Sequence, residues 1–312
     1  MLALRIKGYE QREEEVYMNI VVCVKPVPDV SIVSLDPKTG LIDADDLVYM
    51  VNPHDMAAVE EAVKIKEEND SCHVTLVSVA PLSTRRVLQR CLAIGADDAI
   101  FVWDSSFENL DSYATGEILA KAISSLQCDL ILCGQKAMDT DAGLVGSVIA
   151  EILNIPLASR VVKIDVSPDF EKVAVESKLE KGNREQIDVT LPAVLAVEVD
   201  LNRPRYASLP ALMAGLRKDI KEYSLATLKL SSEEVGSKMA KTKTIATSLP
   251  KPRPKKVFTP DSQLSAQERM RLIMSGGVTQ KQSDLIRGTP KEIAAKIVQF
   301  LDSKKLLPET LQ

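Results

Sequence analysis

The chain has few of the residues that build catalytic or metal centres. It contains only two histidines, and its five cysteines form no CxxC pair. No group of His, Cys, Asp and Glu has the spacing of a metal site, and no nucleophile has a base positioned to activate it. A GxGxxG fingerprint and a Walker lysine are also missing. These absences predict a protein that acts by holding a ligand or a partner, with no catalytic or metal residues of its own.

Long apolar runs and excess positive charge are missing as well. No run approaches the about 18 apolar residues that a membrane span requires. Lys and Arg number 39 against 44 Asp and Glu, so the net charge of −5 predicts no general affinity for nucleic acid or anionic membranes. The cysteines lie in or beside apolar runs, as reduced structural thiols do, which indicates a cytoplasmic location. Residues 1–17 lack the features of a signal peptide and are interpreted as an upstream start or a disordered leader.

From Met18 onward, short β-branched runs alternate with segments of helical periodicity. Ser83 is a candidate N-cap for one of the helices, and Gly95 is placed to end it. The alternation predicts right-handed βαβ crossovers and therefore an α/β fold with a parallel sheet. The expected strands span 19–25, 73–79, 99–103 and 129–133, and the expected helices span 55–68, 84–94, 112–126 and 143–153.

After Pro156 the pattern changes to strands without helices between them. These strands, at 160–166, 172–179, 186–191 and 193–200, predict an antiparallel addition to the same domain. The run PKPRPKK at 250–256 indicates an extended linker. Ser265 with Glu268, and Thr289 with Glu292, form capping boxes before two C-terminal helices. The expected organisation is a leader at 1–17, an α/β domain at 18–220, a linker at 221–256 and a helical arm at 257–312.

The glycine-rich segment GQKAMDTDAGLVG, residues 134–146, follows directly on a predicted strand. Ligands of parallel sheets bind beyond the carboxyl ends of the strands, where this loop lies. In one interpretation Asp141 or a neighbour caps a helix that starts near Ala142. In the other, the helix N-terminal amides around Gly143 to Gly146 face a phosphate, and Asp139 or Thr140 contacts a ribose or base. The residues alone leave both open.

Two further motifs also have two interpretations. In NPHD, residues 52–55, Asn52 or Asp55 can cap a helix, whereas His54 is either a base or a turn residue. In SLPALMAGL, residues 208–216, Ser208 is a candidate N-cap before a helix with an apolar stripe. That stripe is either core or a hydrophobic surface offered to a partner protein.

Six motifs together resemble one family. VVCVKPVPD, NPHDMAAVEEAVKIKE, LAIGADDAI, GQKAMDTDAGLVG, LPAVLAVEVD and NRPRYASLPALM occur in this order between about residues 18 and 220. The chain resembles the beta subunit of electron-transfer flavoprotein, the FixA-like family. The resemblance implies a Rossmann-like fold of the adenine nucleotide alpha hydrolase-like type. It also implies a heterodimer with an alpha subunit that carries FAD, so that the chain is an electron carrier subunit and not a complete enzyme.

The resemblance also implies a nucleotide, AMP or a second FAD, in residues 18–220. The implied contacts are Cys23, Asn52, Pro53, His54, Asp55, Val79, Gly134, Gln135, Lys136, Ala137, Met138, Asp139, Thr140, Asp141, Ala142, Gly143, Leu144 and Val145. The carboxylates of Asp139 and Asp141 would face away from the phosphate. AMP-binding members have a threonine where this chain has Val145, and bifurcating members have GDTAQVGP where it has TDAGLVGS. The chain fits neither pattern in full.

The two nucleotides imply different functions. With AMP, the complex would carry electrons from acyl-CoA dehydrogenases of fatty acid β-oxidation, through the alpha-subunit FAD, to a membrane quinone or iron–sulfur oxidoreductase. With FAD, it would bifurcate electrons from NADH. A free-standing, universal-stress-like nucleotide-binding protein is a further alternative. The implied dehydrogenase-docking residues are Tyr206, Leu209, Leu212 and Met213, with Leu209 as the anchor. The arm at 257–308 is expected to wrap onto the alpha subunit.

Overall fold

A computed structural model of the chain describes residues 17–32, 47–69, 71–107, 110–231, 235, 238–246, 259–274 and 288–303. By its internal contacts the chain divides into two units, Met1–Ser248 and Leu249–Gln312, and each is considered separately below. Nearly all of the leader, residues 1–16, lies outside the described residues.

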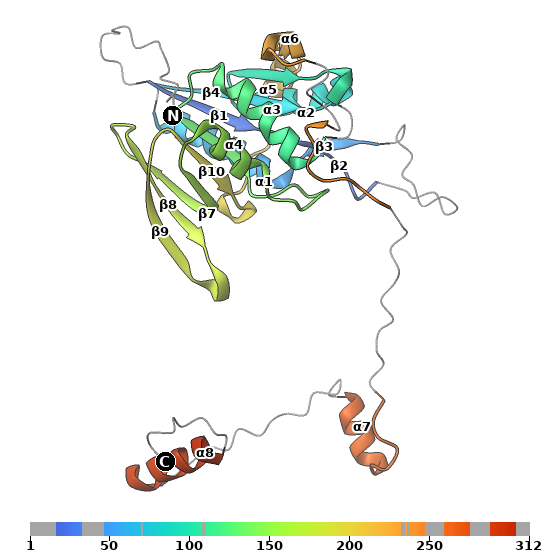
Figure 1. Cartoon of the computed structure of the whole chain (residues 1–312), viewed down its shortest axis with the longest axis vertical. Coiled ribbons are helices and arrows are strands. Elements are labelled where there is room, and N and C mark those ends of the chain that lie inside the picture. Colours follow the sequence, from blue (N-terminus) through green and yellow to red (C-terminus); the bar gives the residue numbers. More distant parts are fainter. Residues whose placement is uncertain are drawn as a thin grey trace. The chain divides into compact units, whose positions relative to one another are not determined.

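The first unit is built on a nine-stranded sheet in the order β11-β5-β4-β1-β6-β10-β7-β8-β9 (Figure 1). The strands from β11 to β7 run parallel, and β8 and β9 are antiparallel to their neighbours. A small antiparallel sheet pairs β2 with β3. The bounds are β1 Met18–Cys23, β2 Pro26–Pro28, β3 Tyr49–Val51, β4 Cys72–Val79, β5 Asp98–Val102, β6 Leu130–Gly134, β7 Leu157–Val166, β8 Lys172–Lys178, β9 Arg184–Thr190, β10 Ala193–Val197 and β11 Lys221–Tyr223. The predicted α/β fold with a mostly parallel sheet is confirmed.

Helices cover both faces of this sheet. The main ones are α1 Pro53–Glu68, α2 Arg85–Leu92, α3 Ser112–Ser124 and α4 Val145–Leu153. Successive side chains of a strand point to opposite faces, so Ile20 and Val22 of β1 join one core with α1 and α2. Val21 and Cys23 join a second core with α3 and α4. Two apolar layers therefore hold the carboxyl ends of the parallel strands in fixed positions.

The position of β10 differs from the prediction. The strand expected at 193–200 was assigned to an antiparallel addition, but β10 lies inside the main sheet and runs parallel to both β6 and β7. All five of its residues, AVLAV, are buried. A continuous apolar run is typical of a central strand covered on both faces, and it explains why this strand enters the parallel part. Within the nine-stranded sheet, the antiparallel pairs are β7 with β8 and β8 with β9.

Local boundaries also differ from the predictions. Ser83 does not cap α2, because it lies inside a short 3-10 turn, Leu82–Thr84, and the N-cap residue is Thr84. The range 221–256, expected to be a linker, begins with β11, which pairs with β5, and continues with α6, Leu225–Leu228. Ser208 does cap α5, Leu209–Gly215, by accepting a hydrogen bond from the N–H of Ala211.

In the second unit the structure describes α7, Ala266–Met274, and α8, Pro290–Ser303. Both predicted capping boxes are supported by their bonds. The Glu268 carboxylate accepts from the Ser265 N–H at 3.1 Å, and Glu292 accepts from the Thr289 N–H at 2.9 Å. Of the helices in the described part of the chain, none is long and apolar enough to cross a membrane.

Candidate functional site

A cavity of about 1510 Å³ opens beyond the carboxyl ends of β1, β4 and β6. Strand β1 lies between β4 and β6: the chain continues from β1 to β4 and β5 on one side, and then returns to β6 on the other side of β1. Such a switch point is where open α/β sheets bind ligands. The predicted site residues in its lining are Cys23, Asn52, Asp55, Val79, Gly134, Gln135, Lys136, Ala137, Thr140, Ala142, Gly143, Leu144 and Val145.

Asp55 ties the ends of two of these strands together. Its carboxylate accepts the N–H of Lys25 at 2.7 Å, after β1, and the N–H of Gly134 at 2.9 Å, at the end of β6. Burial raises the pKa of Asp55 to about 7, although these hydrogen bonds act in the opposite direction. A side chain expected to cap α1 is thus used to set the geometry of the site.

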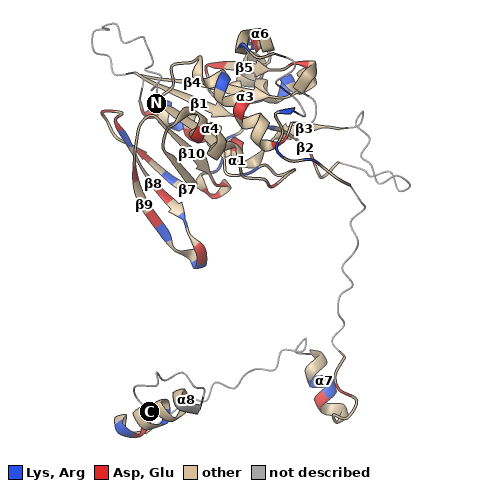
Figure 2. Ribbon diagram, in the orientation of Figure 1, with Lys and Arg blue, Asp and Glu red and all other residues tan. Residues whose placement is uncertain are grey.

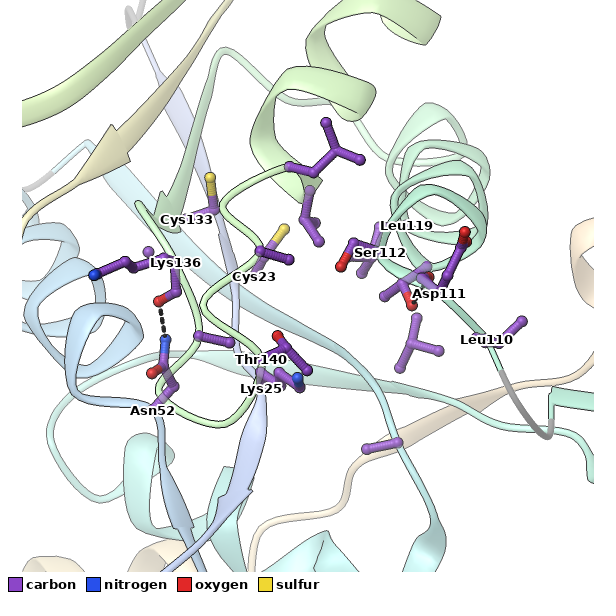
Figure 3. A pocket seen from close by; sticks show the side chains of 18 of the residues that line it. Cys23, Lys25, Asn52, Leu110, Asp111, Ser112, Leu119, Cys133, Lys136 and Thr140 are labelled. Atoms are coloured by element: carbon purple, nitrogen blue, oxygen red, sulfur yellow. Dashed lines mark hydrogen bonds between the residues drawn. The ribbon is translucent and has the colours of Figure 1, made fainter. Parts of the chain in front are cut away.

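Asn52 holds the glycine-rich loop in the same way. Its amide group donates to the carbonyl of Lys136 at 2.9 Å and accepts from the N–H of Met138 at 3.0 Å, as Figure 3 shows for the first bond. Although Asn52 is the N-cap residue of α1, its side chain makes no capping bond. The side chains of Asn52 and Asp55 therefore reach 79 to 86 residues along the chain, to the loop after β6.

The glycines of the loop are required by close contacts. A Cβ on Gly134 would lie 2.2 Å from the Asp55 carboxylate, and one on Gly146 would lie 2.7 Å from the Cys133 sulfur. Gly143 has a φ of +59°, which favours glycine. The backbone thus comes directly against α1 at Gly134 and against β6 at Gly146, with no space for a side chain at either position.

The N-terminus of α4 borders the cavity without a side-chain cap. The helix begins at Val145 with Leu144 as the N-cap residue, and in the described part of the chain no side-chain capping bond is made to it. Of the two interpretations of this segment, the one in which Asp141 or a neighbour caps the helix is wrong, because the N-cap residue Leu144 makes no side-chain bond and Asp141, with a φ of +53°, pairs with Lys136 at 2.7 Å. Uncapped N–H groups at a helix of nine residues form a favourable environment for an anion.

Five predicted residues do not line the cavity: Pro53, His54, Met138, Asp139 and Asp141. The carboxylates of Asp139 and Asp141 each pair with a lysine of the site, Asp139 with Lys25 and Asp141 with Lys136. Their negative charge is thereby balanced beside the uncapped helix.

His54 lies behind the loop, with its Nε2 3.7 Å from a carboxylate oxygen of Glu198. Burial lowers the pKa of His54, and Glu198 partly opposes this effect. Its Nδ1 is buried and has no hydrogen-bond partner among the described residues. The buried thiols of Cys23 and Cys133 also have raised pKa values because of burial, to about 12 for Cys133. No nucleophile with an activating base emerges from these groups.

The sequence patterns did not predict the opposite wall of the cavity. Figure 3 shows Asp111, Ser112 and Leu119 of the α3 region facing the loop across the pocket. An Asp before a helical pattern is an N-cap signal, and Asp111 does cap α3, but nothing in the pattern linked it to the loop. The other lining residues that were not among the implied nucleotide contacts are Val24, Lys25, Ala80, Pro81, Trp103, Phe107, Leu110, Thr115, Cys133 and residues 240–244.

A second feature, away from the cavity, is the exposed apolar surface of α5 and the residues before it. Tyr206 is fully exposed, Leu209 is 72% exposed and Met213 is 46% exposed, whereas Leu212 is half-buried. The segment is firmly held: Arg205 pairs with the buried Glu60 at 3.0 Å.

The far end of α5 is held against a neighbouring helix. A Cβ on Gly215 would lie 2.7 Å from the carbonyl oxygen of Gln89 on α2, so the two backbones are in close contact. The Gln89 side chain also donates to the carbonyl of Leu216 at 2.9 Å. An exposed apolar group on a rigid support is a suitable contact for another protein.

Comparison with known proteins gives a consistent result. The family model described as "Electron transfer flavoprotein domain" matches residues 39–228. The chain is 38% identical over 234 residues to electron transfer flavoprotein subunit beta of Thermoanaerobacterium thermosaccharolyticum, covering 75% of this chain and 88% of that protein. It is 36% identical over 220 residues to the caffeyl-CoA reductase-Etf complex subunit CarD of Acetobacterium woodii (70% and 83%). With electron transfer flavoprotein subunit beta of Megasphaera elsdenii, identity is 31% over 297 residues (93% and 100%).

Proposed function

Because this chain belongs to the electron transfer flavoprotein family and resembles its beta subunits along most of its length, we propose that it is the beta subunit of a heterodimeric electron carrier. In this proposal the chain binds AMP or FAD in the cavity, and an alpha subunit carries the FAD that accepts and donates electrons. The complex passes electrons from acyl-CoA dehydrogenases to a membrane quinone or iron–sulfur oxidoreductase.

The uncapped N-terminus of α4 is the observation that carries the nucleotide proposal. Its free N–H groups lie at the switch point of the sheet, next to glycines that let a ligand approach the backbone. Pairing of Asp139 and Asp141 with lysines removes the repulsion that two free carboxylates would exert on a phosphate. These features suit the phosphate of an adenine nucleotide, with Val79 and Thr140 among the residues near the rest of it.

The test is to count nucleotides in the purified complex. The chain would be co-expressed with an FAD-binding alpha-type subunit, and the nucleotides would be released with acid and identified by chromatography and mass. One FAD and one AMP per heterodimer would support a simple electron carrier. A chain that stays monomeric and carries no nucleotide would overturn the proposal.

A second function, an FAD-binding subunit of a bifurcating complex that uses NADH, is favoured by two observations. One relative is named as a subunit of a caffeyl-CoA reductase-Etf complex. The cavity of about 1510 Å³ exceeds the roughly 300–1,000 Å³ of ordinary ligand sites, so it has room for more than a mononucleotide. Two FAD per heterodimer in the same measurement would favour this function over the first.

For the docking of the dehydrogenase we propose the exposed surface of Tyr206, Leu209, Leu212 and Met213. Its support is the combination of apolar exposure with a rigid base, since Leu209 projects from the first turn of a helix that is fixed at both ends. A leucine that enters a partner's pocket loses its contact with water without first having to be ordered.

A further inference from the structure

The cavity has an outer wall that the glycine-rich loop does not supply. Residues 240–244 line it, although they lie about a hundred residues after the loop. The chain reaches this position from an apolar base, because Val235 and Met239 are buried in the same core cluster as α3. The residues just before the wall are therefore fixed in the core of the fold.

A single carboxylate holds the wall in place. Asp111 accepts from the N–H of Ala114 at 2.9 Å with one oxygen and thereby caps α3. Its other oxygen accepts the N–H of Lys241 at 2.8 Å, and the N–H and hydroxyl of Thr242 at 2.7 Å and 2.9 Å. Partial burial raises the pKa of Asp111, but these hydrogen bonds outweigh it and lower the pKa below its usual range.

The wall also brings positive charge to the cavity. Of the described lining residues, four are lysines, and two of them, Lys25 and Lys136, are paired with aspartates of the loop. The ammonium group of Lys241 lies 5.2 Å from the centre of the Tyr113 ring. Within the described part of the chain, no carboxylate lies at ion-pair distance from Lys243.

We propose that residues 240–244 form a strap that is part of the nucleotide site, with Asp111 as its positioning residue and Lys243 as a cation for the ligand's phosphate. This inference rests on the proposed function, because it takes the ligand to be a phosphorylated nucleotide. The three bonds from the strap to Asp111 keep the outer wall closed. Lys243 adds an electrostatic attraction for the phosphate, which salt can screen. Loosening the strap should therefore speed the release of the nucleotide.

The experiment uses the co-expressed complex and measures how fast its nucleotide is released after dilution. Asp111→Asn should release it about tenfold faster, and Thr242→Val, which removes one hydroxyl bond, about threefold faster. Lys243→Gln should also speed release, and its release rate should depend less on salt than that of the wild type.

Two matched variants control for the loss of any exposed charge. Asp169→Asn removes a carboxylate that accepts bonds from Ser167 and Glu171 in its own turn, between β7 and β8, and Lys172→Gln removes a lysine at the start of β8. Both should release nucleotide at the wild-type rate.

The outcomes separate the two proposals. A wild-type complex without a bound nucleotide would overturn the proposed function. A complex that binds nucleotide, but releases it at the wild-type rate from Asp111→Asn and Thr242→Val, would overturn the strap alone. If Asp111→Asn does not fold, Thr242→Val decides this point. An unchanged salt dependence in Lys243→Gln would overturn the role of that lysine.

Discussion

At the scale of single residues, Asp55 couples the stability of the fold to pH. Its pKa is raised by burial to about 7 from the ordinary value of 3.8. Between these values the folded chain holds a proton that the unfolded chain has released. The free energy of unfolding should therefore fall as the pH rises from about 4 to 7, by up to about 4 kcal/mol from this group.

Asp55→Asn should flatten this part of the pH profile, because the amide does not titrate. The measurement is urea unfolding of the full chain at pH 4.5 and 7.5, for the wild type and the variant. Asp188→Asn, on the edge strand β9, serves as the control and should keep the wild-type profile. If Asp55→Asn lost as much stability between the two pH values as the wild type, the raised pKa would be wrong.

Gly134 has the tightest contact of the site. An alanine there would place its Cβ 2.2 Å from the Asp55 carboxylate and 2.7 Å from the Cβ of His54, so one of the two residues must move. Gly134→Ala should lower the free energy of unfolding by about 3 kcal/mol.

Gly182→Ala is the control for Gly134→Ala, because that position has a φ of +82° but no atom within 4 Å. Its cost should be only the backbone strain, about 1 kcal/mol. Denaturant unfolding of both variants measures the two effects. Equal losses of unfolding free energy would indicate that the contact with Asp55 does not determine the cost of Gly134→Ala.

At the scale of elements, α5 carries an exposed apolar surface. Shortening a side chain of this surface should affect binding to a partner and not folding. Leu209 is 72% exposed, so Leu209→Ala should change the free energy of unfolding by less than about 0.5 kcal/mol. If Leu209 is the docking anchor, the same change should weaken association with an acyl-CoA dehydrogenase by about 2 kcal/mol, roughly 30-fold.

The measurement for Leu209→Ala is the rate of electron transfer from the dehydrogenase to the complex, as a function of complex concentration. Ile152→Ala is the matched control, because Ile152 is an apolar side chain on α4 that is 41% exposed. Weakening by both variants to the same degree would argue against a specific docking surface on α5.

The elements also show which structural features can be predicted from sequence patterns. Periodicity predicts α1 and α3 well, because all residues of each apolar face lie within one stretch of the sequence. It does not predict that Asn52 and Asp55 bond the loop after β6, nor that Asp111 holds Lys241, because these partners are 79 to 130 residues apart. Caps that bond their own helix have a signal beside that helix in the sequence, as Ser265 and Thr289 do. The bonds of a side chain to a distant loop have no such signal.

The error at β10 has a similar cause. The run AVLAV has no polar alternation, which indicates a strand buried on both faces, yet its position after two antiparallel strands suggested another antiparallel partner. The order of the strands along the chain was a less reliable basis for the prediction than the absence of polar residues in this run. The helix from 145 to 153, by contrast, was placed within two residues of its start, since its apolar periodicity and the preceding glycines agree.

At the scale of the whole molecule, charge is distributed so that it favours specific over general association. Figure 2 shows acidic and basic residues interspersed along β8 and β9, and β9 is a sheet edge. Pairs such as Arg184 with Glu176, at 2.9 Å, cover that edge with charge. Charged side chains on an edge strand discourage pairing with another sheet, so the apolar surfaces elsewhere are the better candidates for contacts with partners.

The second unit carries such surfaces. On α7, Met270 and Met274 are 63% and 84% exposed, and on α8, Val298 and Phe300 are 54% and 56% exposed. Two short helices cannot bury a sizeable core by themselves. We therefore expect residues 257–308 to wrap onto the alpha subunit, where these side chains would be removed from water.

A chain that ends at Pro250 tests this expectation. Burial of even two of these side chains is worth about 3 kcal/mol, so the truncated chain should bind the alpha subunit at least tenfold more weakly than the full chain. The dissociation constant can be measured by titrating labelled alpha subunit with each chain, and a chain lacking residues 1–16 serves as the control. If the truncated chain bound with unchanged affinity, the arm would have another role. Because the cavity and the strap lie entirely before residue 250, truncation should leave the nucleotide content of any heterodimer that forms unchanged, which separates the arm from the site.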